Sequence, residues 1–231
     1  MAIQLCWICG NPATTREHSA KRSDITAVFQ DISQVRPVHF RSGHRSTAIG
    51  SADHPLLRWK SQLCAHCNNT LTQPYDRAWE GTSAFLRSKG KLVPKSCISL
   101  KPALPQNTTR RLLHLHLYFV KQLGCYLRDE NLSFDLDEFA SAVRGGRTHP
   151  DVYLKFSPGI EVGGQEQVGM TPLHCHMHNN NLMAATWIYT VGSLSVQTIF
   201  FRPDQPKMLM RNRAWHPRSE RSRIEIENFW D

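Results

Sequence analysis

Two Cys-x-x-Cys pairs constrain the fold of this chain more than any other feature of its sequence. Cys6 and Cys9 form the first pair, and Cys64 and Cys67 form the second. Four thiolates complete the tetrahedral coordination of one zinc ion, so the two pairs predict a closed, structural zinc site. Such a site would hold the start of the chain against the region that follows residue 63.

Polar residues with the chemistry of a second site lie next to these pairs. Glu17 and His18 are adjacent between the pairs, and Asn68 and Asn69 directly follow the second pair. A lone Glu-His pair is an ordinary surface feature, but its position between two zinc knuckles favours a catalytic metal site. Asp76 lies in the first turn of an expected helix, where a structural role at the helix dipole competes with metal binding.

Length and composition indicate a globular chain without a membrane span. The chain has 231 residues, 40% of them hydrophobic, which is enough for one large or two small domains. It contains no apolar run of about 18 residues. The first residues lack the pattern of a secretory signal peptide, so a cytoplasmic location is expected, where cysteines stay reduced and often bind metal.

The charge balance favours a polyanionic partner. The formal net charge is +9 and the isoelectric point is about 9.4, which is most simply explained by binding to nucleic acid. Lys21 and Arg22 follow the Glu-His pair, while Arg41 and Arg45 lie in a basic stretch between the cysteine pairs. These four are predicted phosphate contacts, although a solvated basic loop would look the same.

The pattern along the chain predicts an α+β protein in two parts. Helices are expected over 74–89, 107–128 and 133–144, and strands at 152–156, 183–191 and 194–201. Gly192 and Ser193 predict a two-residue hairpin turn of type II′. Three prolines within 91–106 indicate a connector, so we expect domains over 1–92 and 93–231, the second ending in an antiparallel β region.

Three histidines alternate in the segment just before the last two of these strands. If that segment is itself a strand, His174, His176 and His178 would share one face of it. A metal or phosphate site is one interpretation. An exposed strand face without a ligand is the other, and the sequence leaves both open.

Taken together, C6-W-I-C9, E17-H18 and C64-A-H-C67-N68 resemble the zinc-knuckle branch of the HNH nucleases. These are also called ββα-metal or His-Me finger endonucleases, and the pattern is most similar to the recombination endonuclease VII type. The resemblance covers about residues 1 to 90. It implies a zinc-stapled ββα module. The interval between His18 and Cys64 is long for such a module and must hold an insertion.

The resemblance also implies roles for individual residues. Glu17 and Asn68 would bind a catalytic Mg²⁺ or Mn²⁺ ion, and Asn69 and Asp76 are further candidates for that ion. His18 would be the general base. The structural ion would be Zn²⁺.

The expected function is hydrolysis of phosphodiester bonds in DNA, with phage defence or restriction as one setting. A non-catalytic zinc module that binds nucleic acid is an alternative, and so is an RNA-directed nuclease or toxin. Residues 93–231 would serve targeting, sensing or oligomerisation, through a second copy of the chain or a partner protein.

Overall fold

The computed structural model describes residues 4–42, 44–132, 134–202, 214–217 and 222–229. Helices and antiparallel strands both contribute, as expected for the α+β class. The helices are α1 Arg22–Phe29, α2 Gln73–Arg87, α3 Thr108–Asp129 and α4 Asp137–Gly145, with short turns of 3-10 helix at Pro55–Leu57 and of π-helix at Cys67–Leu71. The strands are β1 Thr15–His18, β2 Val38–Ser42, β3 Arg45–Ile49, β4 Arg58–Leu63, β5 Cys97–Ser99, β6 Val152–Pro158, β7 Val168–Met170, β8 His174–His178, β9 Asn181–Val191, β10 Leu194–Phe201 and β11 Arg223–Glu225.

The largest sheet has five strands and lies in the second half of the chain. Its strand order is β6-β10-β9-β7, and β8 also pairs with β9. The predicted hairpin is confirmed: Leu194 pairs with Val191 across a two-residue loop. Gly192 has a φ of +53°, whereas Ser193 has no positive φ, as a type II′ turn requires.

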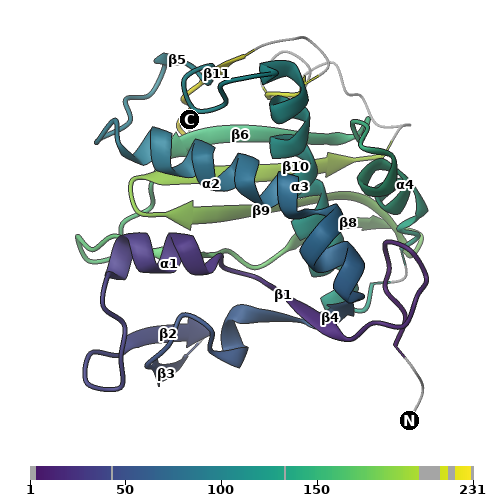
Figure 1. The fold of residues 1–231 in the computed structure, drawn as a ribbon, viewed down its shortest axis with the longest axis horizontal. Coiled ribbons are helices and arrows are strands. Elements are labelled where there is room, and N and C mark those ends of the chain that lie inside the picture. Colours follow the sequence, from purple (N-terminus) through teal and green to yellow (C-terminus); the bar gives the residue numbers. More distant parts are fainter. Residues whose placement is uncertain (1–3, 43, 133, 203–213, 218–221, 230–231) are drawn as a thin grey trace.

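The helices α2, α3 and α4 cover one face of this sheet (Figure 1). Aromatic pairs join the two layers: the ring centroids lie 5.8 Å apart for Trp79 and Tyr189 and 5.9 Å apart for Tyr126 and Trp187. Alternation along β9 and β10 directs every second side chain to this face, and most of these side chains are apolar, with the buried Thr198 opposite Trp187 as a polar exception. The sheet therefore acts as the base on which α2 and α3 are fixed.

The first half of the chain adds smaller elements along the edge of this two-layer body. β1 pairs with β4 in antiparallel orientation, and α2 follows β4 in the chain. The interval between His18 and the second cysteine pair holds α1 and the β2-β3 hairpin. In Figure 1 this hairpin extends away from the main sheet.

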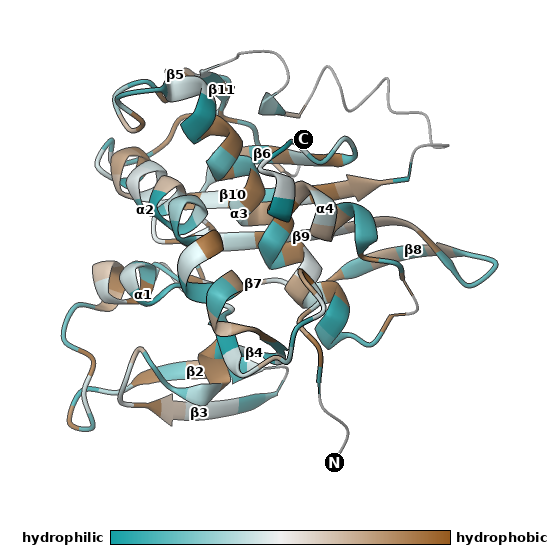
Figure 2. Cartoon of the chain, turned by 45° about the vertical axis from the view of Figure 1, so that its right-hand side comes forward, coloured by the Kyte–Doolittle hydropathy of each residue, from teal (hydrophilic) through white to brown (hydrophobic). Residues whose placement is uncertain are grey.

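One cluster of buried apolar residues extends from Cys6 to Ile226. The boundary expected between residues 92 and 93 does not interrupt this cluster, because α2 and α3 pack against each other across it. Most residues in the second half of α3 are buried in this cluster. Polar residues gather at the tip of the projecting β8-β9 hairpin (Figure 2). Among the described residues, no helix is both long enough and apolar enough to cross a membrane.

Candidate functional site: a cysteine cluster beside a buried network of carboxylates and lysines

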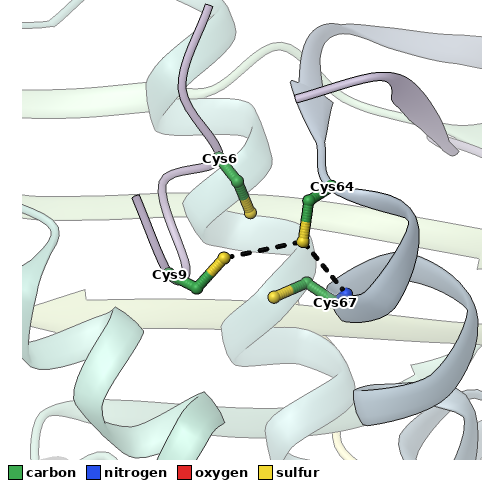
Figure 3. Close-up of side chains that lie close together, drawn as sticks. All are labelled: Cys6, Cys9, Cys64 and Cys67. Atoms are coloured by element: carbon green, nitrogen blue, oxygen red, sulfur yellow. Dashed lines mark hydrogen bonds between the residues drawn. The ribbon is translucent and has the colours of Figure 1, made fainter. Parts of the chain in front are cut away.

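The four cysteines of the two pairs converge on one point. The sulfur atoms of Cys6, Cys9, Cys64 and Cys67 all lie within 4.8 Å of one another. Figure 3 shows the four side chains pointing toward a common centre, with 3.5 Å between the sulfurs of Cys9 and Cys64. Four sulfur ligands at these separations suit a tetrahedral ion such as zinc, so the chemistry of the cluster fits a structural metal site.

The backbone around each pair forms the tight turn that such a site needs. Gly10 has a φ of +77°, and its N–H donates to the carbonyl of Cys6 at 2.8 Å. In the second pair, the N–H of Cys67 donates to the sulfur of Cys64 at 3.3 Å. Burial raises the pKa of the Cys6 and Cys67 thiols, so a bound cation would be needed to keep all four sulfurs as thiolates.

The first cysteine turn is fixed against α3 and α4. A Cβ atom added to Gly124 of α3 would lie 2.6 Å from the ring of Trp7, so the indole rests directly on the helix backbone. Arg144 of α4 donates a hydrogen bond to the carbonyl of Ile8. The turn between the first two cysteines therefore depends on helices from the second half of the chain.

The second cysteine turn leads directly into a hydrogen-bonded path toward Glu17. The hydroxyl of Thr15 on β1 donates to the carbonyl of Leu63 at 2.9 Å, so its oxygen is left to accept from the amide nitrogen of Asn68 at 3.1 Å. This arrangement fixes the amide orientation. The other amide atom, Asn68 Oδ1, is buried and has no hydrogen-bond partner among the described residues.

Glu17 and Asp76 lie together with two lysines. Glu17 is only 4% exposed. Its Oε1 lies 3.2 Å from the Nζ of Lys121 and 3.7 Å from that of Lys21. Asp76 Oδ1 lies 2.7 Å from Lys121 Nζ and 2.9 Å from Lys21 Nζ. We call these four residues the carboxylate–lysine network; it joins β1, α2, α3 and the segment before α1.

The charges of this network stabilise one another. Burial alone would raise the pKa of Asp76, but the ammonium groups of Lys121 and Lys21 lower it below its ordinary value. Burial would likewise lower the pKa of Lys121, yet the carboxylates of Glu17 and Asp76 raise it. Asp76 and Lys121 are therefore both charged at neutral pH, and the formal charges of the four side chains sum to zero.

A buried glutamine completes the surroundings of Glu17. Gln122, next to Lys121 on α3, donates from Nε2 to Glu17 Oε1 at 3.2 Å and to the carbonyl of His18 at 3.3 Å. Its Oε1 accepts from the indole of Trp59 on β4 at 2.8 Å. The contacts with lysine and glutamine all use Oε1 of Glu17, so Oε2 is not part of them.

The β1-β4 pairing is irregular beside Glu17, and α3 compensates for the irregularity. Arg16 pairs with Gln62 and His18 with Arg58, so β4 carries extra residues opposite Glu17. The freed N–H groups of Lys60 and Ser61 donate to the carboxylate of Asp129, the last residue of α3, at 2.7 and 2.5 Å. A bulge of this kind redirects side chains, and it is frequent next to active sites.

His18 belongs to a separate, more accessible group of charges. Its Nε2 lies 3.3 Å from Asp53 Oδ1, without the geometry of a hydrogen bond, and its side chain is 20% exposed. Asp53 also pairs with Arg22 at 3.0 Å and with Arg58 at 3.4 Å. Burial and the positive charge of Arg58 lower the pKa of His18 below its ordinary value, so the imidazole is neutral at pH 7.

The other predicted site residues occupy different surroundings. Asn69 is exposed on the π-helical turn. Arg41 and Arg45 are exposed on the β2-β3 hairpin, and Arg22 is 66% exposed at the start of α1. Lys21, in contrast, is directed into the carboxylate–lysine network. Its predicted role as a phosphate contact stays a prediction.

The segment with the three histidines forms strand β8, which is exposed along its whole length. Its register slips at His176 and Met177 because Met183 is an extra residue in the partner strand β9. Within the described ranges, these histidines do not come close enough to form a three-ligand metal group, and only the four cysteines do.

Sequence analysis missed two residues of the site. Lys121 and Gln122 are both buried, at 0% and 1% exposure, in the middle of α3. A signal was present: they interrupt an otherwise apolar run, Y118-F-V-K-Q-L-G-C-Y-L127. Buried polar groups need partners, so two such residues within a core helix indicate a polar site across from it.

Comparisons of the chain with protein-family models, with curated proteins and with solved structures give no match in any of the three. Its function must therefore be inferred from the residues and their geometry.

Proposed function

We propose that this chain is a divalent-metal-dependent endonuclease of the ββα-metal kind that hydrolyses phosphodiester bonds in DNA. The observation that supports this best is the junction between the cysteine cluster and β1. Asn68 directly follows the last cysteine and hydrogen-bonds to Thr15, two residues before Glu17 on the same strand. The order of an antiparallel strand pair followed by a helix also agrees with this class.

The donor set fits a hard divalent cation. Asn68 Oδ1 is a buried carbonyl oxygen without a hydrogen-bond partner in the described part of the chain, and Glu17 Oε2 is not used by the lysines. Mg²⁺ and Mn²⁺ bind carboxylate and amide oxygens of this type. Glu17 and Asn68 would hold the ion, with Asp76 nearby, and the ion would offset negative charge on a bound phosphodiester.

His18 has the properties of a general base. Its lowered pKa leaves the imidazole neutral at pH 7, and its partial exposure gives water access. In the proposed reaction, His18 takes a proton from water while the water oxygen bonds to phosphorus. The bond from phosphorus to the leaving oxygen breaks, and that oxygen takes a proton from solvent.

Basic side chains around His18 suit a polyanionic substrate. Arg58 and Arg22 share the partner Asp53 with the imidazole of His18, and Arg41 and Arg45 are exposed on the β2-β3 hairpin. With a formal net charge of +9, long-range attraction also favours nucleic acid.

Plasmid cleavage tests the proposal. Zinc-loaded protein is freed of other metals by gel filtration and incubated with supercoiled plasmid, with and without added Mg²⁺ or Mn²⁺. We expect nicking only with added ion. His18→Ala should lower the rate by about 10²–10⁴-fold, which is the usual contribution of a general base. Glu17→Gln should lower it by weakening metal binding.

His178→Ala is the matched control, because this exposed histidine lies on β8 outside the proposed site. It should cleave at the wild-type rate. Zinc content and circular dichroism establish that each variant is folded. Cleavage by His18→Ala at the wild-type rate, or nicking unaffected by Mg²⁺ and Mn²⁺, would contradict the proposal.

A non-catalytic zinc module that binds nucleic acid is the second candidate, and one observation favours it: Oε1 of Glu17 and Oδ1 of Asp76 already contact lysines. This candidate is expected to bind DNA tightly, in a salt-dependent manner, without cutting it under any metal. Labelled RNA in the same assay separates an RNA-directed nuclease from both.

A further inference from the structure

The ammonium group of Lys121 is buried and surrounded by oxygen atoms, as a bound metal cation would be. Its Nζ lies 2.7 Å from Asp76 Oδ1, 3.2 Å from Glu17 Oε1 and 3.4 Å from Thr72 Oγ1. The contacts with Asp76 and Thr72 are hydrogen bonds, and the contact with Glu17 is an ion pair, so three oxygens surround the ammonium group. The side chain is 0% exposed, so bulk water does not solvate the ammonium group.

The oxygens around Lys121 Nζ come from two parts of the chain: the segment between the two cysteine pairs and the segment after the second pair. Glu17 lies on β1, and Thr72 follows the second cysteine turn, where its hydroxyl also approaches the carbonyl of Cys67 at 2.9 Å. Asp76 lies one turn further on, in α2. Two carboxylates and a neutral oxygen are a ligand type that hard divalent ions prefer.

Charge balance explains why the network is stable without such an ion. Glu17 and Asp76 contribute two negative charges, and Lys21 and Lys121 contribute two positive charges. Removing one member of a buried ion pair leaves an uncompensated charge in a medium of low polarity, which strongly destabilises the fold. A divalent ion would therefore have to compete with an ammonium group that is already in place.

We propose that Lys121 is a built-in counter-ion, which competes with the divalent cation for Glu17 and Asp76 and so sets the metal affinity of the site. This rests on the proposed function, because that function assigns the cation to Glu17. Lys121 is a positioning residue that acts through the carboxylates. The inference gives α3, in the half of the chain without any resemblance, a direct role at the site.

The test replaces Lys121 by methionine, which keeps the length of the side chain and removes its charge. In zinc-loaded Lys121→Met, the network carries one excess negative charge, and Mg²⁺ or Ca²⁺ should compensate for it. We expect thermal unfolding to shift upward with added ion. From titrations of that shift, the apparent affinity should be at least about tenfold tighter than in the wild type.

Two further variants make the result specific. Lys155→Met removes a lysine from another part-buried ion pair, 2.5 Å from Glu227, and should show no more response to the ion than the wild type. In the double variant Lys121→Met with Glu17→Gln, the charges of Asp76 and Lys21 balance again. The response to Mg²⁺ should then be lost.

Each outcome decides the matter. Lys121→Met that is unfolded without metal but folds with Mg²⁺ or Ca²⁺ supports the proposal. A variant that is folded yet responds to the ions no more than the wild type overturns it, as does one that stays unfolded with either ion. Because unfolding is measured, an ion response in Lys121→Met together with an absence of plasmid cleavage would count against the nuclease and not against the counter-ion. If the wild type cleaves plasmid but the unfolding of Lys121→Met does not respond to Mg²⁺ or Ca²⁺, the nuclease proposal stands and the counter-ion proposal is wrong.

Discussion

At the scale of single residues, Asp24 is a buried carboxylate outside the site that depends on three hydrogen-bond donors. It is 1% exposed, and its carboxylate accepts from the indole of Trp79 at 2.7 Å, the hydroxyl of Tyr189 at 2.9 Å and that of Ser83 at 3.0 Å. These donors come from α2 and β9, so one side chain fixes α1 to both layers of the molecule.

We expect Asp24→Ala to lower the free energy of unfolding by about 3 kcal/mol or more, because three buried donors lose their acceptor at roughly 1–3 kcal/mol each. Asp24→Asn should cost much less. Its carbonyl oxygen can still accept from Trp79 and Tyr189, and its amide can donate to Ser83. Urea denaturation measures both. If both variants lose the same free energy of unfolding, the hydrogen bonds accepted by Asp24 are not what stabilises the fold here.

The wild type and Asp24→Asn should also differ in how their free energy of unfolding depends on pH. Burial raises the pKa of Asp24 above its ordinary value, in spite of the three hydrogen bonds and the charge of Arg87. A raised folded-state pKa stabilises the fold below the unfolded-state pKa, and this contribution is lost as the pH rises through the folded-state pKa. The stability of the wild type relative to Asp24→Asn should therefore fall from acidic to neutral pH. A rise over that range would show that the pKa is not raised.

Individual residues also show where the sequence was informative. The cysteine spacing was sufficient to predict the cluster, because two Cys-x-x-Cys pairs supply the four thiolate ligands that a structural zinc site needs. The contacts of Glu17 with Lys121 and Gln122 could not be predicted, since these two residues lie more than a hundred residues further along the chain. Only the packing of α3 against β1 and α2 brings them together.

At the scale of elements, α3 is the centre of the molecule. It packs on α2, supplies Lys121 and Gln122 to the site, and accepts the first cysteine turn at Gly124. Its position was predictable from apolar spacing, and the predicted range 107–128 agrees with Thr108–Asp129. Its function was not predictable, because periodicity identifies the buried face of a helix but not the element that this face contacts.

The contact of Trp7 with Gly124 can be tested by substitution. Gly124→Ala should lower the free energy of unfolding by about 1–3 kcal/mol, because the new methyl group overlaps the indole ring. This loss would occur although alanine favours a helix by about 1 kcal/mol over glycine.

The control for this substitution is Gly145→Ala at the end of α4, where the nearest atom to an added Cβ lies at 3.7 Å. It should be neutral or slightly stabilising. Both are measured by thermal or urea unfolding, with the fluorescence of tryptophan as the signal. If Gly124→Ala is as stable as the control, the indole does not rest on the helix backbone.

At the scale of the whole molecule, the continuous core implies that the two halves unfold together. Buried residues on both sides of the connector belong to one cluster, and the first cysteine turn contacts α3 and α4. A zinc ion held by the four cysteines would contribute folding free energy directly. Losing it should therefore affect the second half of the chain as well as the first.

Hydrogen exchange measures this effect. Removing zinc with a chelator, or replacing Cys64 by serine, should increase exchange in α3 and in the β9-β10 hairpin together with the cysteine turns. Cys97→Ser, an exposed cysteine outside the cluster, is the control and should leave exchange unchanged. Faster exchange confined to residues before 92 would instead indicate two independent units.

The position of Lys121 has a consequence for how the segment that carries the cysteine turns can be inherited. A segment whose buried carboxylates were all neutralised by lysines of the same segment could be transferred between proteins as one piece. Here the balancing charge is carried by a helix beyond the connector, and a fragment ending at residue 92 would keep Glu17 and Asp76 but only one of their two cations. Any recombination that transfers the cysteine turns to a new chain must bring α3 with them or supply a substitute.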